Sequence, residues 1–243
     1  MSEVRSPLVR GGVLEPGGRW RNWGRSESAH PQYVATVASV DEVIETVAFA
    51  RDEGLTVKPI RNMVNHETNE LFFDNLEIPA ENLIGEEGSG FRYILDGLNA
   101  ERTLIAAECI GDGYWFIDKV ATYAKERIVF DRPIGQNQGV QFPIARAYVN
   151  VEAANLMRFE AAREFDAHQD CGAEANMAKL LAADASWEAA NACIQFHGGF
   201  GFAADYDIER KFRETRLYQV APISTNLILS YVAEHILGLP RSF

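Results

Sequence analysis

The chain of 243 residues has few cysteines, no long apolar run and no excess of positive charge. Its three cysteines, Cys109, Cys171 and Cys193, are far apart and lack partners at metal-ligand spacing. We therefore expect reduced, buried thiols in a cytoplasmic protein, and no metal site. No apolar stretch approaches the length that spans a bilayer, which argues against membrane insertion. The net charge of -12 argues against binding nucleic acid through its phosphates.

What the sequence does contain is typical of a globular protein of one or two domains with a sizeable core. Hydrophobic residues make up 47% of it and charged residues 24%. Apolar residues at helical spacing predict helices over about residues 90–125, 144–167, 173–196, 207–218 and 225–237. Residues 129–143 hold two prolines and two glycines, so we expect a loop there. Three long helices with shorter ones predict a mainly α fold with a C-terminal antiparallel bundle.

The first part of the chain has a different composition, with stretches that are typical of strands. Residues 33–37 and 55–60 have the composition of strands, and a helix is expected between them from about residue 39 to Gly54. A further strand is predicted over residues 70–78, where Pro79 ends it. The bundle is thus expected to follow a small, incomplete α/β segment.

Glu101 lies on the apolar face of the first long predicted helix, in line with Phe91, Ile94, Leu98, Ile105 and Cys109. A carboxylate among apolar side chains has to be paired, protonated or hydrated. Spacing alone leaves two interpretations open. Glu101 is either a buried acid paired with a nearby arginine, or a catalytic base beside a small-molecule site.

Two stretches of the sequence resemble known families. Residues 22–24, 29–31, 38–43 and 54–59 look like the start of an FAD-linked sugar-lactone oxidase, without the glycine turn that wraps the flavin pyrophosphate there. The rest resembles the C-terminal region of an acyl-CoA dehydrogenase, in family order over residues 64–74, 78–85, 100–102, 123–130, 133–138, 195–201 and 213–216. We therefore divide the chain into an oxidase-like segment (1–60), a remnant of the dehydrogenase middle β domain (61–86) and the C-terminal helical domain (87–243).

The second resemblance implies site residues. In much of that family the base that removes the α proton precedes the last helix, at the position of Pro222, and proline cannot take a proton. A minority places the base on the long helix, which assigns it to Glu101, with Arg102 contacting substrate or pairing with a carboxylate. The resemblance also implies that the adenosine pyrophosphate of FAD is held from a neighbouring subunit by Arg127, Phe130, Gln138, Gln195 and Gly199.

Simpler interpretations of these residues stay open. Arg127 on its own reads as a surface ion pair, and residues 198–201 as a plain helix C-terminal turn. Asp131 departs from the glycine usual in the family, and a carboxylate near a pyrophosphate is unfavourable unless it points away.

The resemblance implies FAD-dependent α,β-dehydrogenation of an acyl-CoA thioester, an electron-transfer acceptor and a homo-oligomer, a dimer or a tetramer. Because the family's flavin-ring-binding domain is largely missing from the sequence, we expect the isolated chain to be impaired. The alternatives are a non-catalytic helical oligomerisation module or a fused gene product without function. A yellow purified protein favours the enzyme, and a colourless oligomer favours the module.

Overall fold

The computed structural model describes residues 13–16, 20–21, 28–29, 33–36, 54–64, 68–77, 80 and 83–242, with the backbone alone for those before residue 54. Its contacts divide the chain into two compact units. One comprises Met1–Asn62 and His66–Tyr93, and the other comprises Met63–Asn65 and Ile94–Phe243. The three-part division expected from the sequence stays a prediction.

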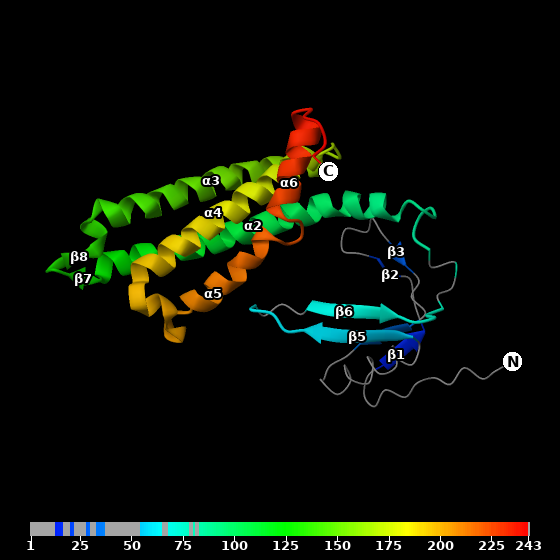
Figure 1. The fold of residues 1–243 in the computed structure, drawn as a ribbon, viewed down its shortest axis with the longest axis horizontal. Coiled ribbons are helices and arrows are strands. Elements are labelled where there is room, and N and C mark those ends of the chain that lie inside the picture. The colour runs from blue at the N-terminus through cyan, green and yellow to red at the C-terminus, as the bar shows by residue number, and fades with distance from the viewer. Residues whose placement is uncertain are drawn as a thin grey trace. The chain divides into compact units, whose positions relative to one another are not determined.

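The described part of the first unit is built from two-stranded antiparallel ladders (Figure 1). They pair β1 (Val13–Pro16) with β4 (Tyr33–Thr36), β2 (Trp20–Arg21) with β3 (Ser28–Ala29), and β5 (Leu55–Ile60) with β6 (Thr68–Phe73). The strands predicted near residues 33–37 and 55–60 are confirmed.

The two predicted strands do not pair with each other, because β5 pairs antiparallel with β6 and β4 pairs with β1. The helix expected between them lies outside the described residues. The strand predicted over residues 70–78 ends early, at Phe73. The Asp74 N–H donates to the Gly54 carbonyl at 2.8 Å, which closes the ladder, and Asn75 at φ 50° turns the chain away.

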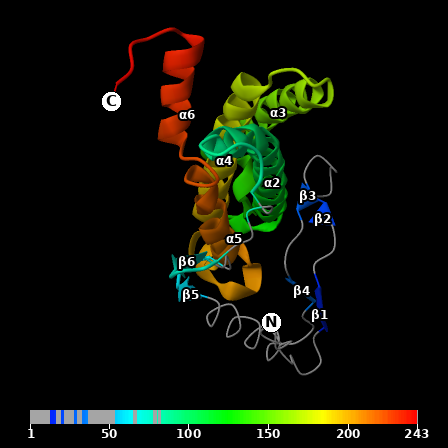
Figure 2. The ribbon, with the colours of Figure 1, turned by 90° about the vertical axis from the view of Figure 1, so that its right-hand side faces the viewer.

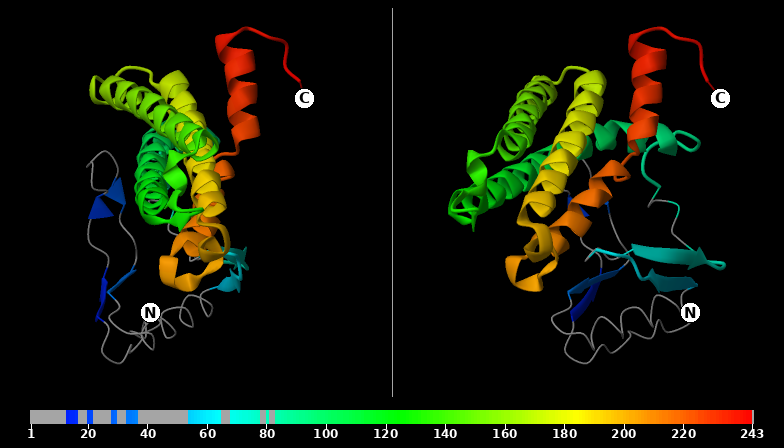
Figure 3. Two further views of the ribbon diagram at one scale, coloured as in Figure 1. Left: turned by 90° about the vertical axis from the view of Figure 1, so that its left-hand side faces the viewer. Right: turned by 60° about the vertical axis from the view of Figure 1, so that its left-hand side comes forward.

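The second unit is helical and takes α2 (Gly90–Glu126) from Ile94 onward. Its long helices are α2, α3 (Gln138–Asp166) and α4 (Gly172–His197), followed by the shorter α5 (Ile208–Thr215) and α6 (Thr225–Tyr231). The three long helices lie side by side in Figure 1 and in both views of Figure 3. Figure 2 shows α6 beside α4, and the Ser224 hydroxyl caps α6 by accepting from the Leu227 N–H at 3.3 Å. The predicted mainly α fold with a helical bundle is confirmed.

One predicted loop is largely ordered structure. A hairpin of β7 (Ile128–Val129) and β8 (Arg132–Pro133) follows α2, and a 3-10 turn (Ile134–Gln136) leads into α3. Helix α3 begins at Gln138 and includes Pro143, so the loop prediction is wrong from there on. Pro143 falls in the second turn, where its missing N–H leaves only the carbonyl of Gly139 without a helical partner. Gly139 is exposed, so water can satisfy that carbonyl.

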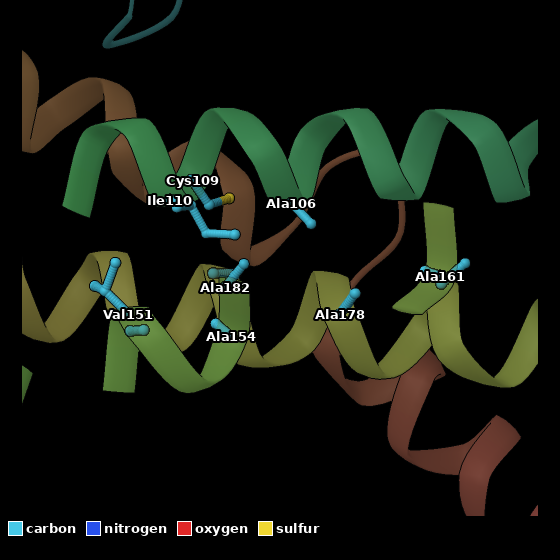
Figure 4. Packing of buried hydrophobic residues seen from close by; sticks show 11 residues of the cluster. Ala106, Cys109, Ile110, Val151, Ala154, Ala161, Ala178 and Ala182 are labelled. Atoms are coloured by element: carbon cyan, nitrogen blue, oxygen red, sulfur yellow. The ribbon is translucent and has the colours of Figure 1, made fainter. Parts of the chain in front are cut away.

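Small side chains make up the core between the long helices. Figure 4 shows Ala106, Cys109 and Ile110 of α2 facing Val151 and Ala154 of α3 and the alanines of α4. Alanines at an interface let helix axes approach closely and keep a high helix propensity. A second cluster centred on Phe116 and Val120, both almost fully buried, packs α2 against α4 and α5.

Buried polar contacts fix α5 on the bundle. Lys211 of α5 pairs with Asp112 of α2 at 2.5 Å, and the hydroxyls of Ser186 and Thr215 join α4 to α5 at 2.6 Å. Such pairs favour one arrangement of the helices, because any other would leave buried polar groups without partners.

Gly113 of α2 sits where Val151 of α3 comes closest. A Cβ atom on Gly113 would stand 2.7 Å from Val151 Cγ2, whereas Gly111 faces open space. We expect Gly113→Ala to lower the free energy of unfolding by about 1–2 kcal/mol, because overpacking outweighs the gain in helix propensity. Gly111→Ala is the matched control and should gain up to about 1 kcal/mol.

Urea unfolding of the two variants measures this difference. In a double variant with Val151→Ala, the loss should be smaller than the sum of the two single losses. Equal effects of alanine at Gly111 and Gly113 would contradict the close approach of α2 and α3.

The three cysteines are free and buried, as predicted. Burial raises the pKa of all three thiols, that of Cys193 to about 12, so none is a reactive thiolate at neutral pH. In the part of the chain that the structure describes, no helix combines the length and the apolar character needed to cross a membrane.

Candidate functional site

A pocket of about 570 Å³ lies where the C-terminal ends of α2 and α4 meet. It is lined by Tyr123, Arg127, Val129, Ile134, Phe196, His197, Gly198, Gly199, Phe200 and Ala203. Two of the site residues predicted from the sequence, Arg127 and Gly199, therefore share one pocket although they are far apart in the chain.

Arg127 is held in place by its backbone, while its side chain is available to a ligand. Its N–H donates to the Tyr123 carbonyl at 2.8 Å, and its carbonyl accepts from the Ile134 N–H at 2.9 Å. The guanidinium lies over the Phe200 ring, 5.7 Å from the centroid. Among the described residues it forms no ion pair. The structure thus does not support the surface-ion-pair interpretation, and the planar guanidinium suits a phosphate or carboxylate.

The glycines after α4 form a 3-10 turn (Gly198–Phe202) with distinct demands at each position. Gly198 has φ 58° and ψ -131°, a conformation that side chains rarely adopt. A Cβ on Gly201 would stand 2.8 Å from the Ile194 carbonyl oxygen, so packing excludes it. Gly199 is different, because its Cβ position meets nothing within 4 Å and its φ is ordinary. Folding does not require this glycine, and its bare backbone leaves room in the pocket for a ligand.

His197 lines the same pocket and was missed by sequence reasoning. Its Nδ1 lies 2.8 Å from the Cys193 carbonyl oxygen, and its ring stacks on Tyr123 with 4.1 Å between centroids. Burial lowers the pKa of His197; the Cys193 carbonyl opposes that shift and the Lys119 ammonium adds to it. A histidine directly before a Gly-Gly turn was the available signal, and an isolated histidine is too common to single out.

The other residues expected to bind a nucleotide do not line this pocket. Phe130 lies at the tip of the β7–β8 hairpin with 94% of its surface exposed and φ 51°, a left-handed conformation that is strained for phenylalanine. Asp131 beside it has φ 63°. Gln138 is exposed at the first turn of α3, and Gln195 is exposed in the last turn of α4.

The predicted orientation of Glu101 is wrong within this chain, because Glu101 is exposed and Arg102 is buried. The buried face of α2 runs through Arg102, Ala106, Cys109 and Gly113; of the predicted stripe, Cys109 is buried as expected and Ile105 is half-buried. Phe91 and Ile94, expected on the buried face, are 74% and 60% exposed.

Arg102 is a buried cation that is only partly satisfied. Its Nη1 donates to the Asn99 side-chain oxygen at 2.8 Å, while its buried Nε has no partner among the described residues. Burial lowers its pKa, and Tyr231 and Glu101 oppose that shift. The phenol of Tyr231 also lies near Gly172, where a Cβ would stand 3.0 Å from its oxygen. Helix α6 thereby reaches the region of Arg102.

The two groups of predicted site residues lie at opposite parts of α2. From Glu101 to Glu126 the helix rises about 1.5 Å for each of roughly 25 residues, or about 37 Å. Within one copy, Glu101 and the Arg127 pocket therefore cannot act on the same small molecule.

The matching family model, "Acyl-CoA dehydrogenase, C-terminal domain", covers residues 88–237. Acyl-CoA dehydrogenase fadE12 of Mycobacterium bovis is 38% identical over 194 residues, which are 78% of this chain and 50% of that protein. An acyl-CoA dehydrogenase of Bacillus subtilis is 37% identical over 171 residues, 70% of this chain and 45% of the other. The chain thus spans about half the length of these curated relatives.

Solved structures agree on the fold. A glutaryl-coenzyme A dehydrogenase in complex with glutaryl-CoA superimposes with a TM-score of 0.73 at 32% identity, covering 78% of this chain and 49% of that one. An FAD complex of PigA superimposes with a TM-score of 0.73 at 26% identity, over 76% and 49%. The match to residues 88–237 does not extend to the oxidase-like segment, whose resemblance stays a prediction. On these matches and the helical bundle that carries them, the chain belongs to the acyl-CoA dehydrogenase family through the C-terminal domain of that family.

Proposed function

We propose that this chain contributes the C-terminal half of an FAD-dependent acyl-CoA dehydrogenase site that is completed between copies. The observation that carries the proposal is the pocket that joins Arg127, the bare backbone of Gly199 and aromatic walls. Arginine and backbone N–H groups suit the pyrophosphate of a dinucleotide, and the aromatic rings suit its base.

Two copies are needed because of the length of α2. Only the ribityl chain separates the pyrophosphate of FAD from its flavin ring, which is far less than the roughly 37 Å between Glu101 and the end of the helix. The pocket of one copy would therefore serve the Glu101 of another. We include Phe130, Gln138 and Gln195 at the rim of the shared site, since a second copy can meet exposed side chains.

The reaction proposed for Glu101 is removal of the α proton of an acyl-CoA thioester. Its carboxylate takes that proton while FAD, when bound, supplies the acceptor for the β hydride, and a double bond forms between the two carbons. Arg102 follows Glu101 in the chain, but its side chain is buried against Asn99, so we assign it no substrate contact within one copy. Because Glu101 is exposed in this chain, we expect weak turnover by the chain alone, since a base of this kind works best in a site closed to water.

The absorbance spectrum of the purified chain loaded with FAD, followed by acyl-CoA titration against an artificial electron acceptor, tests the proposal. Flavin absorbance that stays with the protein through gel filtration, and bleaches with acyl-CoA, is the expected result. A colourless protein without turnover contradicts it. The electron-transfer partner and the cytoplasmic location expected from the sequence belong to this proposal.

Gly199→Ala tests the role of the pocket in FAD binding without disturbing the fold. Its Cβ enters open pocket space, so we expect an unchanged melting temperature and FAD affinity about tenfold weaker, the effect of one badly placed methyl group. Gly139→Ala is the control, because its Cβ also meets open space but lies outside the pocket. Calorimetry and flavin fluorescence measure the two effects. FAD affinity equal to that of wild type in Gly199→Ala would place the cofactor elsewhere.

The second candidate function, a non-catalytic assembly module, is favoured by the apolar side chains exposed along α3. Val149, Leu156 and Phe159 are each more than half exposed. Faces of this kind mark association surfaces. A colourless, stable oligomer would support this function over the enzyme.

A further inference from the structure

His197 is fixed rigidly in the wall of the pocket. Its Nδ1 bonds the Cys193 carbonyl at 2.8 Å, its ring stacks on Tyr123, and the Tyr206 ring meets it edge-on with centroids 6.0 Å apart. A carbonyl oxygen only accepts hydrogen bonds, so Nδ1 carries the proton. Only 4% of the residue is exposed.

The opposite ring nitrogen is the available one. Nε2 makes no hydrogen bond to the described residues. It is also not one of the fully buried side-chain polar atoms that lack a partner among these residues. With Nδ1 protonated and the ring neutral, Nε2 carries a lone pair and accepts a hydrogen bond. The pocket thus presents a ring-nitrogen acceptor beside the Arg127 cation and the aromatic rings of Tyr123 and Phe200.

We propose that His197 recognises the nucleoside of the bound dinucleotide by accepting a hydrogen bond at Nε2 from an amine or hydroxyl of the adenosine. A neutral imidazole nitrogen repels phosphate oxygens, which only accept, so Arg127 and His197 divide the ligand between phosphate and nucleoside. The aromatic side chains around the ring suit a flat base. The inference rests on the nucleotide pocket of the proposed function, but not on dehydrogenation.

The substitution His197→Asn tests the role of Nε2 without removing the bond to Cys193. On the same helix, Asn191 and Asn176 each donate from Nδ2 to the carbonyl four residues earlier, at 2.6 and 2.7 Å. Asparagine at 197 can do the same for Cys193 and offers no ring nitrogen to the pocket. We expect a lower melting temperature, because asparagine loses the ring stack on Tyr123, and ADP binding about fivefold weaker by calorimetry, the size of one neutral hydrogen bond.

Ligand analogues give the same answer without any variant. If the base amine is the donor, inosine diphosphate binds wild type about fivefold more weakly than ADP; if a ribose hydroxyl is the donor, 2′-deoxy-ADP or 3′-deoxy-ADP does so. The penalty for the affected analogue should disappear in His197→Asn. Equal ADP binding by wild type and variant, no ADP binding by wild type, or full-strength binding of all analogues overturns the inference. ADP binding with this pattern but without acyl-CoA turnover would keep it and reject the dehydrogenase proposal.

Discussion

Replacing Lys179 by alanine is expected to lower the free energy of unfolding by about 3–5 kcal/mol. Lys179 lies on α4 and is fully buried. Its ammonium donates to the carbonyl oxygens of Tyr218 and Ile223, at 2.5 and 2.7 Å. Alanine leaves both carbonyls without that donor and opens a cavity where the aliphatic stem was. In a helical unit of this size the melting temperature should fall by roughly 10 °C.

Lys179→Met distinguishes the contribution of the hydrogen bonds to stability from that of the packed side chain. Methionine fills the space of the stem but cannot donate, so a loss of about 1–3 kcal/mol is expected. Burial lowers the pKa of Lys179, and methionine also removes the cost of burying that charge, which limits the loss. Lys125→Met, at an exposed position, is the control and should change stability by less than about 0.5 kcal/mol. Chemical denaturation measures all three, and a Lys179→Met protein as stable as wild type would show that the ammonium does not hold this segment.

Lys179 hydrogen-bonds to both ends of the segment 218–223, which contains Pro222. This is the position where much of the family was expected to carry its base. The two acceptor carbonyls flank that position, and Ser224 begins α6 directly afterwards. Sequence reasoning placed Lys179 on a helix rich in alanine without singling it out. Nothing in the spacing distinguishes a lysine that reaches two distant carbonyls from one in solvent, because its partners lie about 40 residues later in the chain.

Predictions from the sequence succeeded where local chemistry decides the structure. The bounds of α4, a stretch rich in alanine that ends at His197 directly before Gly198, follow from propensity and capping alone. Pro143 was misjudged because a proline near a helix start removes one hydrogen bond without ending the helix.

The prediction of which face of α2 is buried failed for a different reason. Leucine, isoleucine and phenylalanine mark a buried face in most helices, but in the first half of α2 a buried arginine, alanine, cysteine and glycine mark much of it. One residue along a helix is a rotation of about 100°. Placing Glu101 on the buried face therefore predicted a buried Glu101 and an exposed Arg102, the reverse of the structure. At the pocket, Arg127 and Gly199 were found through the resemblance, whereas His197 required knowledge of what its ring contacts.

Glu101→Gln is expected to reduce acyl-CoA turnover by roughly 100- to 10,000-fold, which is the range for removing a general base. Glutamine has nearly the same shape but cannot accept the α proton. Because Glu101 is exposed and its side chain makes no hydrogen bond or ion pair with the described residues, the substitution should leave the melting temperature within about 1 °C of wild type. Single-turnover bleaching of the flavin by acyl-CoA measures the proton-transfer step more directly than steady-state turnover does.

The matched control is Glu108→Gln, an exposed carboxylate two turns further along the same face of α2. It changes the charge of the chain by the same amount, so a long-range electrostatic effect on substrate or cofactor would appear in both variants. Loss in Glu101→Gln alone identifies the base. Full turnover in Glu101→Gln would show that another group takes the proton, and proline at 222 cannot be that group.

A mixture of Glu101→Gln with Arg127→Ala adds a further test of the two-copy site. Exchange of subunits would give some sites intact Glu101 and Arg127 from different copies, so partial recovery of turnover is expected, whereas a site built within one copy would recover none.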